Sequence, residues 1–168
     1  MISSFSSLGQ LSKRAQAFAA VAATVGTGLW VVGGGGGLIA KSLDGNVWTP
    51  AASKGSLTTV VNGVAYGKDD FGDGLWVAAG PGGFAKSTDG NVWSTTLIVG
   101  NITTGRGVAY GKDVYGFGLW IAVGNGFRGI IMKSTNGNVW TETVTDVDTT
   151  KGGLYEAWGR GIWKRWNR

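Results

Sequence analysis

Residues 85–94 read Ala-Lys-Ser-Thr-Asp-Gly-Asn-Val-Trp-Ser, and this stretch has two close copies elsewhere in the chain. Residues 40–49 read Ala-Lys-Ser-Leu-Asp-Gly-Asn-Val-Trp-Thr, and residues 132–141 read Met-Lys-Ser-Thr-Asn-Gly-Asn-Val-Trp-Thr. Each copy follows a Gly-Leu-Trp segment, at residues 28–30, 74–76 and 118–120. The tryptophans of these segments are 46 and 44 residues apart, so the chain consists of repeats of nearly constant length.

Each repeat contains four short segments that read as strands, separated by Gly, Asn and Asp. In the second repeat these segments are Val-Ala-Tyr at 64–66, Leu-Trp-Val-Ala at 75–78, Ala-Lys-Ser at 85–87 and Val-Trp-Ser at 92–94. Gly, Asn and Asp are the residues that tight turns between strands require. A repeat of about 45 residues is typical of propeller blades. The sequence therefore predicts an all-β fold of β-propeller-like blades, each with about four antiparallel strands.

The chain is expected to hold three full repeats and a partial fourth. Blade 1 would span residues 20–60, blade 2 residues 61–104 and blade 3 residues 105–150, which makes the alanine-rich segment after residue 19 a first strand. Residues 151–168 would form the partial fourth blade and a basic aromatic tail. Residues 1–19 would act as a closing strand or an anchor. Lys13 and Arg14, followed by the apolar residues 15–25, also have the order of a signal peptide.

The repeated Ser-x-Asp-Gly-Asn-Val-Trp motif resembles the Asp-box (BNR-type) turn of β-propeller proteins, in the short-repeat form seen in phage and large-virus proteins. Carboxylates also suit calcium, but Asn136 replaces Asp in the third copy, and both residue types accept backbone hydrogen bonds in turns. We therefore predict a structural role, with no metal and no cofactor. The residues assigned to this turn are Ser42, Asp44, Trp48, Ser87, Asp89, Trp93, Ser134, Asn136 and Trp140.

The composition argues against an enzyme. The chain has no His and no Cys, which removes the commonest general base and a common nucleophile. Sialidases carry related blades and use an arginine cluster, whereas Arg14, Arg106 and Arg128 are the only arginines before the tail. We expect a non-enzymatic protein, with a glycosidase-like enzyme as the remote alternative.

The net charge of +5 is concentrated at the C-terminus. Arg160, Lys164, Arg165 and Arg168 lie within the last nine residues, while the remainder of the chain is close to neutral. A nucleic-acid-binding domain would carry a basic stripe across the fold, so no nucleic-acid binding through the blades is expected. No apolar run is long enough for a transmembrane helix.

Two regions are candidates for binding. Residues 68–73 and 112–117 are charged and aromatic loop insertions at matching positions, and variable loops on a fixed scaffold often carry binding. Their candidate residues are Lys68, Asp70, Phe71, Lys112, Tyr115 and Phe117. The tail is the candidate for docking on a partner, through Trp158, Arg160, Trp163, Lys164, Arg165, Trp166 and Arg168.

Three blades and a partial fourth are too few to close a propeller ring, which has four to eight. Open ends would expose strand edges and tryptophan faces that favour association. The sequence thus predicts a structural or interaction protein. It would pair with itself or with other proteins of an assembly such as a virion capsid or tail. We expect it in a virion or at an extracellular surface. The alternative is a lectin-like module that binds a glycan through the insertion loops and exposed tryptophans.

Overall fold

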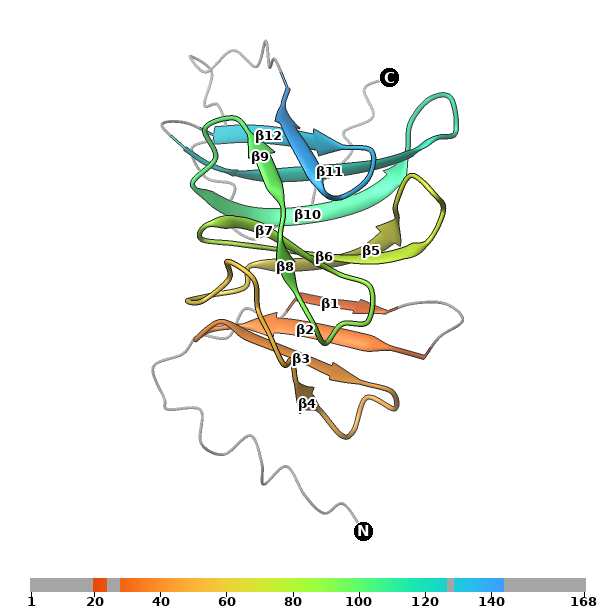
Figure 1. The fold of residues 1–168 in the computed structure, drawn as a ribbon, viewed down its shortest axis with the longest axis vertical. Coiled ribbons are helices and arrows are strands. Elements are labelled where there is room, and N and C mark those ends of the chain that lie inside the picture. Colours follow the sequence, from red (N-terminus) through yellow and green to blue (C-terminus); the bar gives the residue numbers. More distant parts are fainter. Residues whose placement is uncertain (1–19, 24–27, 127–128, 144–168) are drawn as a thin grey trace, which may run out of the picture.

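The computed structural model describes residues 20–23, 28–126 and 129–143, which form three β-sheets (Figure 1). These residues contain strands and turns but no helix, so the predicted all-β fold is confirmed. In each sheet, four strands that follow one another along the chain pair antiparallel in that order. The strand at residues 20–23 also lies where the sequence predicts it.

Each repeat of the sequence forms one sheet. Sheet 1 contains β1 (Ala20–Ala23), β2 (Trp30–Gly34), β3 (Leu38–Ser42) and β4 (Thr49–Pro50). Sheet 2 contains β5 (Gly63–Lys68), β6 (Gly74–Gly80), β7 (Gly83–Ser87) and β8 (Ser94–Thr95). Sheet 3 contains β10 (Thr104–Lys112), β11 (Gly118–Asn125), β12 (Gly129–Ser134), β13 (Val139–Glu142) and one further strand, β9 (Leu97–Val99).

The sheets also share a strand register. Trp30 of β2 lies opposite Ser42 of β3, and the equivalent pairs are Trp76 with Ser87 and Trp120 with Ser134. Because side chains alternate between the two faces of a strand, equal registers place equivalent side chains on equivalent faces. Each sheet therefore has two distinct faces, and the three sheets present them in the same way.

One face of each sheet carries the tryptophans and the other carries aliphatic residues. We call the first the Trp face, formed by Trp30, Val32 and Trp48 in sheet 1, Trp76, Ala78 and Trp93 in sheet 2, and Trp120, Ala122 and Trp140 in sheet 3. We call the second the Leu face, formed by Leu29, Val31 and Ile39 in sheet 1, Leu75, Val77 and Phe84 in sheet 2, and Leu119, Ile121 and Ile131 in sheet 3.

The sheets are stacked in chain order, and the hydrophobic core lies between them (Figure 1). One core cluster joins the Leu face of sheet 1 to the Trp face of sheet 2. The other joins the Leu face of sheet 2 to the Trp face of sheet 3, where the rings of Phe84 and Trp140 lie 4.5 Å apart. The two clusters are therefore two copies of one interface.

Glycines allow this close stacking. A Cβ atom at Gly67 of β5 would lie 2.2 Å from the Tyr110 ring and 2.7 Å from the Trp120 ring of sheet 3. Within the run Gly33–Gly37, Gly33 and Gly34 belong to β2 and only the end of the run forms the turn. A side chain at Gly33 would overlap Val61, which explains why this stretch of strand contains glycine.

The linkers between sheets pair with the sheet that they enter. Ala52 and Ser53, which follow sheet 1, donate backbone hydrogen bonds to the Asn91 carbonyl at the outer edge of sheet 2. After sheet 2, β9 pairs in parallel with β13 of sheet 3, and Leu97 N donates to the Asn138 carbonyl at 2.8 Å. Residues 97–99 precede the predicted start of blade 3 at residue 105, yet they belong to sheet 3.

Replacing Trp140 with alanine is expected to lower the free energy of unfolding by about 3–5 kcal/mol, because the change leaves a large cavity between sheets 2 and 3. Trp140 is fully buried, whereas its counterpart Trp48 in sheet 1 is half-buried. Trp48→Ala should therefore cost clearly less, and urea unfolding followed by tryptophan fluorescence measures both. Equal losses in the two variants would contradict the assignment of the core to the spaces between sheets.

Candidate functional site

The three Ser-x-Asp/Asn turns have the same hydrogen bonds. In the first, Asp44 Oδ1 accepts the backbone N–H groups of Asn46 at 2.8 Å and Val47 at 2.9 Å. Asn91 and Val92 donate to Asp89 at 2.8 and 2.9 Å, and in the third turn the amide oxygen of Asn136 accepts the equivalent pair. The acidic side chains of this motif are therefore used inside their own turns.

Each turn is also tied to its serine and its tryptophan. The Ser42 hydroxyl donates to Asp44 Oδ1 at 3.0 Å and accepts Gly45 N at 2.9 Å. Trp48 Nε1 donates to the Gly45 carbonyl at 3.1 Å. Ser87 with Trp93 and Ser134 with Trp140 make the corresponding side-chain bonds to their own turns. The motif thus positions a tryptophan on the Trp face of its sheet.

These hydrogen bonds lower the pKa of both aspartates. For Asp44 the largest cause is the Val47 N–H, followed by the Asn46 N–H and the Ser42 hydroxyl. For Asp89 the Val92 N–H lowers the pKa most, partial burial opposes it, and the Asn91 N–H, the Ser87 hydroxyl and the Lys41 charge add to the lowering. Hydrogen bonds to the ionised form favour it, so both turns are strongest when the aspartate is charged.

The two insertion loops predicted as binding candidates share one conformation. Asp69 Oδ1 accepts Phe71 N and Asp73 N, both at 2.9 Å, across the β5–β6 loop. Asp113 Oδ1 accepts Tyr115 N and Phe117 N at the same distances across the β10–β11 loop. Neither aspartate was among the predicted binding residues. Their position as the first acidic residue of each insertion is the signal that identifies them.

The aromatic residues of the insertion loops project into solvent. Phe71 is 90% exposed and Tyr115 is 83% exposed, and Phe117 and Val114 are also exposed. Large apolar side chains that a rigid loop holds in water are typical of binding surfaces. Lys68 and Lys112 end β5 and β10 and are exposed as well, and the Lys68 carbonyl accepts Trp120 Nε1 at 2.9 Å.

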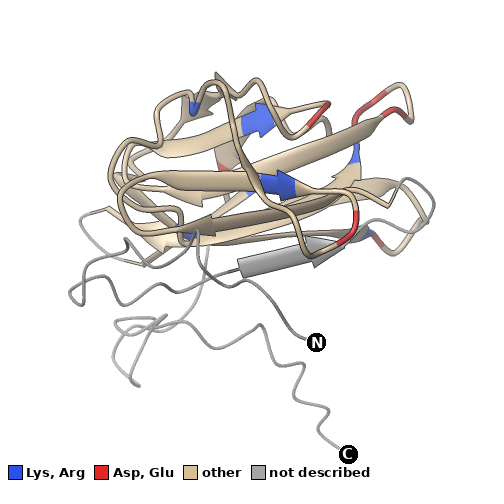
Figure 2. Cartoon of the chain, turned by 90° about the horizontal axis from the view of Figure 1, so that it is seen from below, with Lys and Arg blue, Asp and Glu red and all other residues tan. Residues whose placement is uncertain are grey.

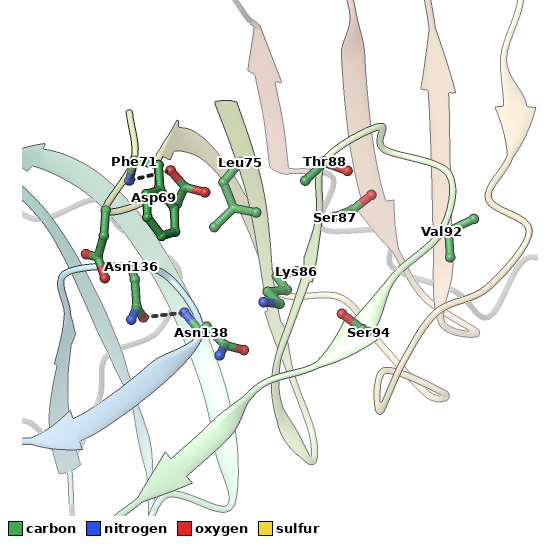
Figure 3. A pocket seen from close by; sticks show the side chains of 11 residues that line it. Asp69, Phe71, Leu75, Lys86, Ser87, Thr88, Val92, Ser94, Asn136 and Asn138 are labelled. Carbon is green, nitrogen blue, oxygen red and sulfur yellow. Dashed lines mark hydrogen bonds between the residues drawn. The ribbon is translucent and has the colours of Figure 1, made fainter. Parts of the chain in front are cut away.

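A cavity of about 300 Å³ lies beside the first insertion loop (Figure 3). Its lining comes from four places: the β5–β6 loop, the start of β6, the β7–β8 region of sheet 2 and the turn of sheet 3. The lining residues are Asp69, Asp70, Phe71, Leu75, Lys86, Ser87, Thr88, Val92, Ser94, Asn136 and Asn138. The cavity therefore combines one exposed aromatic ring with carboxylate, ammonium, hydroxyl and amide groups.

The structure brings some of the predicted site residues together and not others. Asp70 and Phe71 line the cavity, whereas Lys68, Lys112, Tyr115 and Phe117 do not. The tail residues Trp158, Arg160, Trp163, Lys164, Arg165, Trp166 and Arg168 lie outside the described residues. Sequence analysis did not single out Lys86, Thr88 or Asn138 for binding. They occupy repeated motif positions, and only the stacking of two sheets places them around one cavity.

Charge is distributed unevenly over the described residues. Figure 2 shows the acidic residues mostly in loops near one end of the sheets, while most basic residues lie on strands. Asp69, Asp70 and Asp73 make the β5–β6 loop acidic. Lys86, on β7, brings a positive charge to the same cavity. The cavity thus offers both hydrogen-bond acceptors and a charged donor.

The two end faces of the stack form a second candidate surface. Trp30 on the Trp face of sheet 1 is 37% exposed, whereas its counterparts Trp76 and Trp120 are 1% and 0% exposed. On the Leu face of sheet 3, Leu119 and Ile121 are half-buried, while their counterparts in sheet 2 are buried. Both faces of sheet 2 are covered by a neighbouring sheet. Sheets 1 and 3 each have one apolar face that no other sheet of the described residues covers.

The described residues contain no group of three or more acidic, His or Cys side chains arranged to hold a metal ion. They also contain no helix long and apolar enough to cross a membrane.

Replacing Asp89 with asparagine is expected to leave the free energy of unfolding at pH 7 within about 0.5 kcal/mol of the wild type, because Asn136 already makes the same bonds in the third turn. Asp89→Ala is the control and should cost roughly 1–2 kcal/mol, since it leaves two backbone N–H groups without their acceptor.

The two substitutions should differ in acid. The folded pKa of Asp89 lies below its ordinary value of 3.8, so its charged form stabilises the wild type above that pH. This contribution to the free energy of unfolding is lost as the pH falls through the folded pKa. Asp89→Asn has no carboxylate at this position, so its stability does not depend on this titration. Urea unfolding at neutral and acidic pH should show the wild type becoming less stable relative to Asp89→Asn as the pH falls. A pH-independent difference between the two would refute this role for Asp89.

Comparison with known proteins adds little to this description of the site. No protein-family model and no curated protein matches the sequence. Among solved structures, the chain is similar to a fucose lectin from Kordia zhangzhouensis in complex with methyl-fucoside. The TM-score is 0.47 with 14% sequence identity, and the match covers 74% of this chain and 98% of the lectin chain. A likeness this weak assigns neither an activity nor a ligand to this chain.

Proposed function

We propose that the three sheets are blades of a β-propeller of the Asp-box type, and that the protein is a non-enzymatic structural component of a larger assembly such as a virion. Support for the propeller arrangement comes from the four-stranded sheets, which are stacked face to face in chain order with one repeated interface. Support for the Asp-box assignment comes from turns in which Ser and Asp or Asn bind the backbone.

The exposure of Trp30 is the observation that carries the proposed function. Trp76 and Trp120 occupy the same position in their sheets and are buried by the preceding sheet, whereas Trp30 is 37% exposed. A tryptophan contributes about 150–250 Å² of contact area, and burying apolar surface favours association by roughly 25 cal/mol per Å² before the costs of binding. The end of the stack is thus a surface that gains stability from a partner.

The repeated carboxylates support a role without catalysis. Asp44 and Asp89 accept hydrogen bonds from backbone N–H groups of their own turns, and these bonds lower their pKa values. A general acid or base at neutral pH needs a pKa raised toward that pH. These carboxylates therefore fit structural turns and not acid–base chemistry.

Replacing Trp30 with lysine is expected to reduce self-association or binding to an assembly partner while leaving the fold intact, because the side chain lies at an open face. Phe71→Lys is the control, since Phe71 is an even more exposed aromatic residue away from the end faces. Light scattering coupled to gel filtration measures the native mass, and circular dichroism checks the fold. A wild type that stays a soluble monomer at high concentration, unaffected by Trp30→Lys, would rule out the proposed function.

The narrower assignment to a virion has its own test. If the protein is a structural component, it should remain attached to purified particles from its source through washing at high salt. Detection only in the unbound fraction would contradict the assignment to a virion.

A glycan-binding module is the second candidate, and the cavity beside Phe71 favours it. Sugars present hydroxyl groups and weakly apolar ring faces, which amide, carboxylate and aromatic side chains bind together. The cavity offers these groups from Asp70, Phe71 and Asn138. Its volume of about 300 Å³ lies at the lower end of the range for small-ligand sites.

Phe71→Ala is expected to abolish most binding of the isolated chain on a glycan array, because it removes the only ring that lines the cavity in the described structure. Tyr115→Ala is the matched control: Tyr115 has the same place in the β10–β11 loop and does not line the cavity. Loss of binding in both variants, or in neither, would contradict a site at this cavity.

A further inference from the structure

The interface between neighbouring sheets includes a contact between a turn and a strand. A Cβ atom at Gly137, in the turn of sheet 3, would lie 2.6 Å from Leu75 Cδ2 and 3.2 Å from Val77 Cγ2 of sheet 2. A Cβ atom at Gly90, in the turn of sheet 2, would lie 2.9 Å from Val31 Cγ2 of sheet 1. Each turn thus fits closely against the Leu face of the preceding sheet, and glycine is required there.

Sheet 1 presents the same surface, and no other sheet of the described residues packs against it. Gly45 has the matching position and a positive φ of 75°, but no atom lies within 4 Å of a Cβ built there. Trp30 is partly exposed on the same face, and Trp48 is only half-buried. The Trp face of sheet 1 therefore has the shape of one half of the interface between sheets.

Sheet 3 presents the other half. Leu119 and Ile121 are half-buried, whereas Leu75 and Val77, in the same positions of sheet 2, are 4% and 0% exposed. Ile131 is also half-buried where Phe84 of sheet 2 is fully buried. The residues are of the same chemical kind in both sheets, so this Leu face is suited to receive a Trp face.

The outer edges of the sheets repeat the pattern. The carbonyls of Asn91 and Asn138 accept backbone hydrogen bonds from the linker that precedes their sheet. Asn46 has the same position in sheet 1, and within the described part of the chain no backbone group donates to its carbonyl. Sheet 1 thus lacks both the face contact and the edge contact that sheets 2 and 3 receive.

We propose that a second copy of this chain supplies these contacts, with the Leu face of its sheet 3 covering the Trp face of sheet 1. The proposal rests on the proposed function and names the partner. The two surfaces are halves of an interface that the chain already forms twice, so their fit is established by sheets 1 to 3 themselves. Such a head-to-tail contact closes into a ring or extends into a filament, according to the rotation between copies.

Two single-face variants test this proposal. Trp30→Lys blocks the Trp face and Ile121→Lys blocks the Leu face, because each places a charge in the contact. Each variant alone is expected to have the mass of one chain. An equimolar mixture should contain a dimer of two chains, since the first variant keeps its Leu face and the second keeps its Trp face. The mixture cannot grow further, because the remaining faces are blocked.

Controls separate association from folding. Val114→Lys changes an exposed apolar residue of the β10–β11 loop and should leave the native mass of the wild type unchanged. Circular dichroism and thermal unfolding check that both single-face variants fold. If Ile121→Lys does not fold, Leu119→Lys changes a half-buried residue of the same face in its place.

The other outcomes distinguish this proposal from the function on which it rests. If Trp30→Lys reduces association but mixing restores no dimer, the pairing of a Trp face with a Leu face is wrong, while association through the Trp face of sheet 1 still stands. If Ile121→Lys associates like the wild type, the contact is symmetric between Trp faces and the proposal is overturned. If the wild type is a soluble monomer that Ile121→Lys only destabilises, the Leu face of sheet 3 is not a contact between copies, and both proposals fail.

Discussion

The contact between the Trp face of one sheet and the Leu face of the preceding sheet is the interaction on which the rest of the structure depends. Each hydrophobic cluster in the described residues lies between two sheets, and none lies within one. A single four-stranded sheet of this size cannot bury its own apolar surface, as is general for repeat proteins. Each sheet is therefore stabilised by its contacts with neighbouring sheets, and the two end sheets are stabilised least because they have fewer such contacts.

The repeat made the secondary structure predictable, and its register made the turns predictable. Asn136 in place of aspartate pointed to a backbone-bonding turn, and the structure shows its amide oxygen accepting two backbone N–H groups. The consecutive apolar residues of β6 match the burial of both its faces. These features are local or repeated, so a single sequence contains the information for them.

Other features depend on contacts between distant residues, and the sequence did not reveal them. Leu97-Ile98-Val99 has the composition of a strand, but nothing in it indicates a parallel partner in the next sheet. The reason for glycine within β2 was also hidden, because the close approach of Val61, which excludes a side chain at Gly33, is visible only in three dimensions. The cavity was missed for the same reason, since Lys86 and Asn138 come from different repeats.

The way in which each linker runs along the edge of the sheet that follows has a consequence for synthesis on the ribosome. When a new repeat emerges, the segment that will seal its outer edge and the face that will cover its tryptophans have both already been made. The chain can therefore fold from its N-terminus without waiting for later residues, a vectorial order that suits co-translational folding. A repeat inserted or deleted as a whole would keep this order, so the architecture favours change in its number of sheets over evolutionary time.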